Sequence, residues 1–226
     1  MPLLGHAAML LLFDVVQDAI GEHDEWHTHE HLPERLSIPG FVRGIRWVAV
    51  NGRPRYFVMY EVEQLAVLAS TAYLERLNNP SPWTAKMMPF YRGMARGFCS
   101  VAGSFGSGIG HASLLIRFKP DADRGSLLRR WLLEDALPRL TSKSGIGSAH
   151  LFEGALTPAM TKEQRIRGAD AGFDWALLVT GYGQNALEDL MQADFAGTEL
   201  ENRGGMEVAA GIYRMDYSLV EREVRR

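Results

Sequence analysis

Gly5-His6-Ala7-Ala8-Met9-Leu10-Leu11-Leu12-Phe13 is repeated, with similar residues, as Gly110-His111-Ala112-Ser113-Leu114-Leu115-Ile116-Arg117-Phe118. The offset is 105 residues, and without a gap it also pairs Trp26 with Trp131, Pro33 with Pro138 and Gly40 with Gly145. Agreement at one offset over widely spaced positions indicates an internal repeat. We therefore expect copy one over residues 1–105 and copy two over residues 106–226.

The two copies share one predicted order of elements. In copy one we expect strands over 7–13, 41–50, 55–62 and 94–105, and helices over 18–36, with a break near Pro33, and over 64–77. In copy two we expect strands over 111–118, 146–155, 173–182 and 206–220, helices over 126–140 and 186–193, and a longer connection around 157–172. This order, β-α-β-β-α-β, is ferredoxin-like. The predicted class is α+β, with two tandem units whose antiparallel sheets pack together, since an exposed apolar sheet face is unfavourable.

Composition narrows the classes of function. The chain has 226 residues, 46% of them hydrophobic, and a formal net charge of −3 without a basic stripe, which argues against a nucleic-acid partner. A single cysteine, Cys99, excludes an intrachain disulfide framework. The apolar run that ends at Asp14 is too short to cross a membrane and lacks the layout of a signal peptide. We expect a cytoplasmic protein without a membrane partner, with a homodimer of the two-copy chain as one option.

One stretch of copy one resembles a known group of proteins. Trp26-His27-Thr28-His29-Glu30-His31-Leu32-Pro33, followed by Ile38-Pro39-Gly40-Phe41, is similar to the aromatic–His and Pro-Gly pattern of the dimeric α+β barrel superfamily, in particular its EthD-like branch. The resemblance covers about the first hundred residues, and copy two matches only in outline. It implies that the two copies form one barrel within the chain. Members of that superfamily include cofactor-independent monooxygenases, isomerases, cyclases and lyases, as well as haem enzymes.

Histidines between residues 23 and 31 are the main functional candidates. On a helix, His23, His27 and His31 share one face, whereas His29 points elsewhere. A zinc site remains an alternative there, but no complete ligand set can be read, so no metal is predicted. His23, His27 and His29 are interpreted first as surface or rim residues, with His27 also a candidate for substrate binding. His31 is the predicted catalytic acid or base, because its counterpart in copy two is Ala136 and its pKa is suited to proton transfer.

Four further residues are predicted to bind the substrate or to line its cavity. His6 could face His31, or it could form a structural pair with His111 at the start of the first strands. Arg46 could anchor an acidic ligand, or it could be a solvent-facing strand residue. Tyr60 and Trp83 could line an aromatic cavity, or they could be core residues.

The predicted partner is a small hydrophobic molecule bearing a carbonyl or hydroxyl group, which is converted without a cofactor by an isomerase, lyase, cyclase or cofactor-free monooxygenase. The alternatives are a non-catalytic binding or accessory protein and an enzyme that uses a metal or haem.

Overall fold

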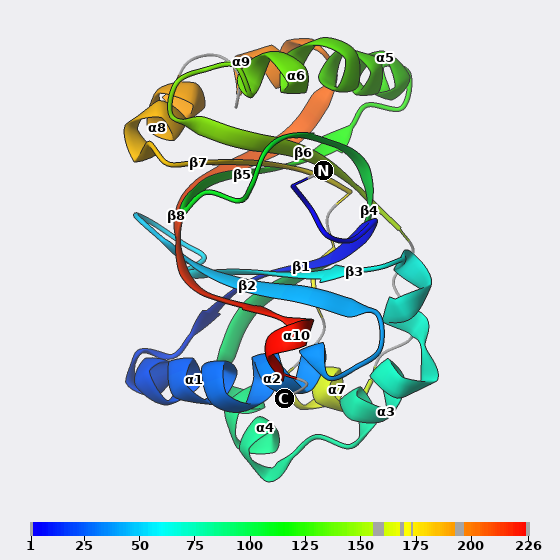
Figure 1. Cartoon of the computed structure of the whole chain (residues 1–226), viewed down its shortest axis with the longest axis vertical. Coiled ribbons are helices and arrows are strands. Elements are labelled where there is room, and N and C mark those ends of the chain that lie inside the picture. The colour runs from blue at the N-terminus through cyan, green and yellow to red at the C-terminus, as the bar shows by residue number, and fades with distance from the viewer. Residues whose placement is uncertain (1, 156–160, 168–169, 173, 193–196, 225–226) are drawn as a thin grey trace.

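The computed structural model describes residues 2–155, 161–167, 170–172, 174–192 and 197–224. Eight antiparallel strands form a closed barrel in the order β1-β3-β2-β8-β5-β7-β6-β4. Copy one contributes β1 (Ala7–Val15), β2 (Phe41–Ala49), β3 (Tyr56–Val62) and β4 (Tyr91–Gly106), and copy two contributes β5 (Ala112–Pro120), β6 (Ile146–Gly154), β7 (Trp175–Gly181) and β8 (Gly205–Val220). Two ferredoxin-like sheets thus face each other, with helices on both outer sides (Figure 1). The predicted fold is confirmed.

The helices of copy one precede β2 and lie between β3 and β4. The first group is η1 (Gln17–Ala19), α1 (Ile20–Trp26), η2 (His27–His31) and α2 (Leu32–Leu36), and the second is η3 (Leu65–Ala69), α3 (Thr71–Asn78), α4 (Pro82–Met87) and η4 (Met88–Phe90). Copy two has α5 (Gly125–Trp131), η5 (Leu132–Ala136), α6 (Leu137–Leu140), α7 (Lys162–Arg167), α8 (Gln184–Gln192), α9 (Thr198–Asn202) and α10 (Glu221–Val224). No helix in these described ranges is both long and apolar enough to span a bilayer.

A π turn replaces the helix break that we predicted near Pro33. The η2 turn ends where the Leu32 N–H donates to the His27 carbonyl oxygen, five residues earlier. In copy two η5 does the same, with Leu137 donating to Leu132. A π turn widens the helix locally, and proline lacks the N–H that a helix interior needs. The helix therefore continues through Pro33 and Pro138, and the prediction of a break was wrong.

The long fourth strand of each copy closes the barrel. Strand β4 pairs with β1 of its own copy and, past Cys99, with β6 of copy two. Strand β8 pairs in the same way with β5 and then with β2. The interior is filled by apolar side chains, among them Leu10, Trp47, Phe57 and Phe152, and by Leu3 from the N-terminal segment. A second and a third core lie between each sheet and its own helices.

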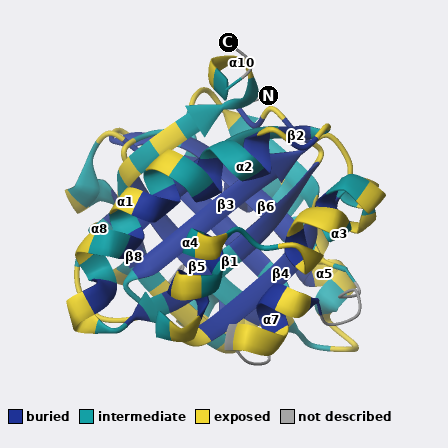
Figure 2. Cartoon of the chain, turned by 90° about the horizontal axis from the view of Figure 1, so that it is seen from below, coloured by how far each residue is buried: buried dark blue, intermediate teal, exposed yellow. Residues whose placement is uncertain are grey.

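Two predicted elements differ from the observed ones. The helix expected over 64–77 is divided, because the Ser70 side chain accepts a hydrogen bond from the Tyr73 N–H and starts α3 there. The connection around 157–172 contains α7, which contacts α3 and lies among the helices of copy one (Figure 2). Residues 157–160, 168–169, Phe173 and Ala193 of the predicted elements lie outside the described residues.

Candidate functional site

The face shared by three histidines is turned toward the sheet of copy one. His23 is 0% exposed, His27 2% and His31 8%, whereas the His29 side chain is 67% exposed and pairs with Glu25. This confirms the predicted division of the helix face. The expectation that His23 and His27 lie at the surface or rim was wrong, because the helix presses against β1 and β3 at these positions.

The buried imidazoles form a continuous aromatic row. The ring centroids of His23 and His27 are 5.5 Å apart, and those of His27 and His31 are 5.6 Å apart. The Trp26 ring lies 4.3 Å from the His31 ring. The Tyr60 hydroxyl, from β3, is 3.3 Å from His27 Nε2, so Tyr60 and His27 form one hydrogen-bonded pair. The structure therefore brings His27, His31 and Tyr60 together.

Burial fixes the protonation state of His27. It lowers the pKa of His27 well below the ordinary value, and the charges of His23, Arg46 and Arg35 lower it further. His27 is therefore a neutral imidazole at neutral pH. Its Nδ1 atom has no hydrogen-bond partner among the described residues. An orphaned buried nitrogen costs about 1–3 kcal/mol, so its position calls for an explanation.

His23 belongs to a separate hydrogen-bonded group. Its Nδ1 lies 3.1 Å from an Asp24 carboxylate oxygen, and its Nε2 lies 3.3 Å from the Tyr91 hydroxyl. The Tyr56 hydroxyl donates to the same carboxylate at 2.7 Å. Burial lowers the pKa of His23, while Asp24 opposes that effect. Both ring nitrogens of His23 thus have partners, unlike those of His27.

Arg46 and Trp83 hold the helices in place. Arg46 is 4% exposed and donates to Asp216 on β8, to the Asp24 carbonyl oxygen and to Thr28 Oγ1. The interpretation of Arg46 as a solvent-facing residue was wrong. Trp83 is half-buried and donates to Glu22, which joins α4 to α1.

His6 lies outside the row of imidazoles. It is exposed where β1 begins, and its backbone bonds to Glu63 and Val101. These backbone hydrogen bonds do not involve His31, and the alternative in which His6 faces His31 stays a prediction.

Copy two has the same backbone but aliphatic side chains in the equivalent layer. His23, His27 and His31 correspond to Leu128, Leu132 and Ala136. Tyr60 lies opposite Met9, and Val179 lies opposite the equivalent Leu114, so Tyr60 corresponds to Val179. Leu128, Leu132, Ala136 and Val179 all belong to the apolar core of copy two. The 105-residue offset could have identified His23 and His27 as well as His31, because it pairs His23 and His27 with leucines and His31 with an alanine.

A segment of copy two packs against the helices of copy one beside the candidate site. Arg35 lies one turn beyond His31, and its guanidinium donates to both Glu163 carboxylate oxygens at 2.7 and 2.8 Å. Glu163 belongs to α7, and both side chains are 2% exposed. A second ion pair, between Arg96 on β4 and Asp170, holds the same connection at 3.0 Å. Sequence analysis missed this pair of contacts, although Leu140 stands at the position of Arg35 in copy two.

Within the described ranges, no group of three histidine, cysteine or acidic side chains is arranged to hold a metal ion. Four hollows among the described residues lie elsewhere on the molecule, and none of these four is lined by His27, His31 or Tyr60.

Known structures share this fold at very low sequence identity. An anthrone oxidase-like protein superposes with a TM-score of 0.69 at 10% identity, over 95% of this chain and 92% of that one. A candidate monooxygenase from Fusobacterium nucleatum subsp. nucleatum gives 0.63 at 6% identity, over 96% of both chains. A variant of chlorite dismutase from Candidatus Nitrospira defluvii gives 0.55 at 11%, over 98% of this chain and 94% of that one. No protein-family model and no curated protein sequence matches the chain.

Proposed function

We propose that this chain, which has the fold of the dimeric α+β barrel superfamily, is a small-molecule enzyme whose working site is the histidine layer of copy one. Copy two serves as the scaffold that completes the barrel. The substrate is a hydrophobic compound with a carbonyl or hydroxyl group, and the reaction begins with a proton transfer by His31. Several reaction types start in this way, including isomerisation, cyclisation and cofactor-free oxygenation.

The contrast between the copies carries this proposal. Two segments with the same π turn and the same following Leu-Pro differ in that one buries three imidazoles and a phenol, and the other buries aliphatic groups. Fold stability does not require the imidazoles, since copy two forms the same layer without them. Burying imidazoles is unfavourable unless every nitrogen is hydrogen-bonded. A role in chemistry explains why copy one retains them.

Neutral His27 and the Tyr60 hydroxyl suit the binding of a carbonyl or hydroxyl oxygen. Burial raises the pKa of Tyr60, so its hydroxyl keeps its proton and can donate to an oxygen on which negative charge develops. The orphaned His27 Nδ1 can serve as acceptor or donor for the same ligand, depending on its tautomer. His31, the most exposed imidazole of the three, is then placed to accept the proton.

A proton-exchange experiment tests the proposal. The probe is anthrone, an aromatic ketone with an acidic C–H group, in D₂O, with deuterium incorporation followed by NMR above the uncatalysed rate. We expect His31→Ala, which introduces the residue of copy two, to lower the exchange rate by on the order of 10²-fold. His29→Ala is the matched control, because it removes an exposed imidazole from the same helix. Equal exchange by the wild type and His31→Ala would refute the catalytic role of His31.

The unpartnered His27 Nδ1 also favours a second candidate, a non-catalytic binding protein, because a bound ligand supplies its partner without any reaction. Such a protein would bind the probe, seen as quenched tryptophan fluorescence, without accelerating exchange.

A further inference from the structure

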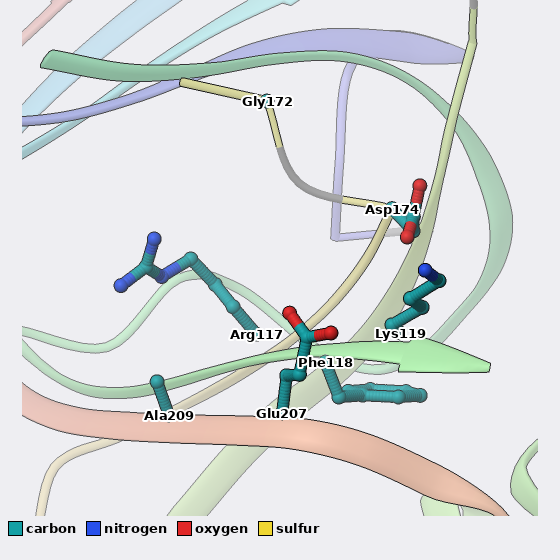
Figure 3. A pocket seen from close by; sticks show the side chains of 7 residues that line it. All are labelled: Arg117, Phe118, Lys119, Gly172, Asp174, Glu207 and Ala209. Carbon is teal, nitrogen blue, oxygen red and sulfur yellow. The ribbon is translucent and has the colours of Figure 1, made fainter. Parts of the chain in front are cut away.

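A hollow of about 250 Å³ lies in copy two between the end of β5, the start of β8 and the residues that precede β7. Its charged lining residues are Arg117, Lys119, Asp174 and Glu207, two cations and two anions. Figure 3 shows the Arg117 guanidinium on one side, Asp174 and Lys119 on the other, and the Glu207 carboxylate between them. A site with balanced charges of both signs favours a ligand that also carries both.

The backbone at Glu207 supports a functional reading of the hollow. Glu207 has a φ of 53°, and it is the one non-glycine residue with positive φ in the part of the chain described. It lies in the bulge where β8 shifts register against β5, between Met206 and Ala209. The equivalent bulge of copy one has Gly93, with a φ of 60°. Copy one thus has a glycine at this position, and glycine adopts a positive φ readily. Copy two has Glu207 there, although a residue with a side chain adopts a positive φ only at a cost in energy.

Arg117 is a second charged residue that copy one lacks. Its counterpart at the 105-residue offset is Leu12, which is 2% exposed in the barrel interior. Burial lowers the pKa of Arg117, which means that its guanidinium is partly removed from water. A partly desolvated guanidinium gains more from a ligand carboxylate than a fully solvated one does.

We propose that this hollow is a second binding site, for a small zwitterion of the amino-acid type, with its carboxylate on Arg117 and its ammonium group on Glu207. Asp174 and Lys119 form the rim. The site is distinct from the histidine layer, because Arg117 lies on the same face of β5 as the interior residue Leu115, whereas the histidines lie on the outer side of the sheet of copy one. The inference does not rest on the function proposed above.

Calorimetric titration of the full chain with glycine, β-alanine, γ-aminobutyrate and 5-aminopentanoate tests the proposal, because the series varies the distance between the two charges. We expect one member to bind at least tenfold more tightly than acetate or methylammonium, each of which carries one of the charges. Acetate binding as tightly as the best amino acid, or no binding by any member, would overturn the proposal.

Copy one supplies the test variants, Arg117→Leu and Glu207→Gly. Each should weaken binding at least tenfold, and Glu207→Gly should also raise the Tm by roughly a few degrees, since glycine suits the positive φ. The control Arg139→Leu removes an exposed guanidinium elsewhere in copy two and should leave binding unchanged. Because Arg117→Leu alters the packing of a partly buried strand residue as well as its charge, Glu207→Gly is the decisive variant. If it is more stable and binds equally well, the proposal is wrong.

Discussion

His31 and Ala136 occupy the last position of the same π turn in the two copies of one chain. Each is followed by Leu-Pro and each is buried against its own sheet, so the backbone environments match while the side chains differ. The chain therefore contains its own reference for what this position requires structurally. In copy two, the methyl group of Ala136 is enough to fill this position.

The reciprocal substitution Ala136→His should destabilise the protein. The imidazole would enter a layer formed by Leu128, Leu132 and Leu137, which offers its nitrogens no side-chain partner. We expect a loss of about 1–3 kcal/mol of unfolding free energy, measured by denaturant melts. His31→Ala should change stability by less than about 1–2 kcal/mol. A larger loss for His31→Ala than for Ala136→His would indicate that the histidine is a structural residue.

Acid should destabilise the fold through its buried histidines. Burial lowers the pKa of His27 and of His23, and it lowers the pKa of His150, with the Arg43 charge, to about 3. The unfolded chain then binds these protons more readily than the folded one. The stabilisation is complete above the unfolded pKa of about 6.5 and falls as pH drops below it, by up to about 1.4 kcal/mol per pH unit for each group.

Denaturant melts at pH 7.5, 6 and 5 measure this slope. His27→Leu, which introduces the residue of copy two, should reduce the slope, and His29→Ala should leave it unchanged because His29 is exposed. An unchanged slope in His27→Leu would mean that this imidazole is not buried in its neutral form.

The Arg35–Glu163 pair should show strong coupling. Arg35→Leu leaves a buried carboxylate and Glu163→Leu leaves a buried guanidinium, so each should cost about 3–5 kcal/mol. The double variant removes both charges and should be more stable than either single variant, since copy two already has Leu140 at this position. A double-mutant cycle by denaturant melts measures the coupling. If the stability losses of the two single variants add up in the double variant, Arg35 and Glu163 do not interact in solution.

Copy one expressed alone should form a dimer. Residues 1–106 would expose the edge of β2 that pairs with β8 and the end of β4 that pairs with β6. Because β6 is the equivalent of β2, two copies of the first unit can pair β4 with β2 in both directions and close a barrel. Light scattering after size-exclusion chromatography gives the mass. A folded monomer would show that the unit is stable without the β2–β8 and β4–β6 pairings.

Much of the fold could be predicted from the sequence, because strands and repeats leave local patterns. The offset that joins Trp26 to Trp131 and Gly40 to Gly145 located both units, and Gly40 and Gly145 indeed adopt positive φ at equivalent corners. The π turn could not be predicted, since the change from the usual helical bond to one five residues back leaves the apolar pattern intact. The interpretation of Pro33 as a break followed from that.

The arrangement of the candidate site could be predicted only in part. His31, His27 and Tyr60 were singled out because imidazole clusters are conspicuous and the repeat offers a comparison, and the structure brings the three side chains together. The contact of Glu163 with Arg35 depends on where a connection of copy two runs in space, and its 128-residue separation leaves no periodic signal. The burial of His23 depends in the same way on tertiary packing, with Tyr91 from β4 as its partner. The division into a working copy and a scaffold copy stays a prediction.

The barrel is closed by two strand pairings between the copies, β2 with β8 and β4 with β6. The first of them joins parts of the chain that are synthesised far apart in time. Arg43 in β2 pairs with Val220 in β8, which is the last of the eight barrel strands to leave the ribosome. Contacts between such distant segments form slowly, because a long loop must close first. Until then the free edge of β2 is open to pairing with a neighbouring nascent chain. A chain released only as far as β7 would carry every buried histidine and still lack a closed barrel around its core.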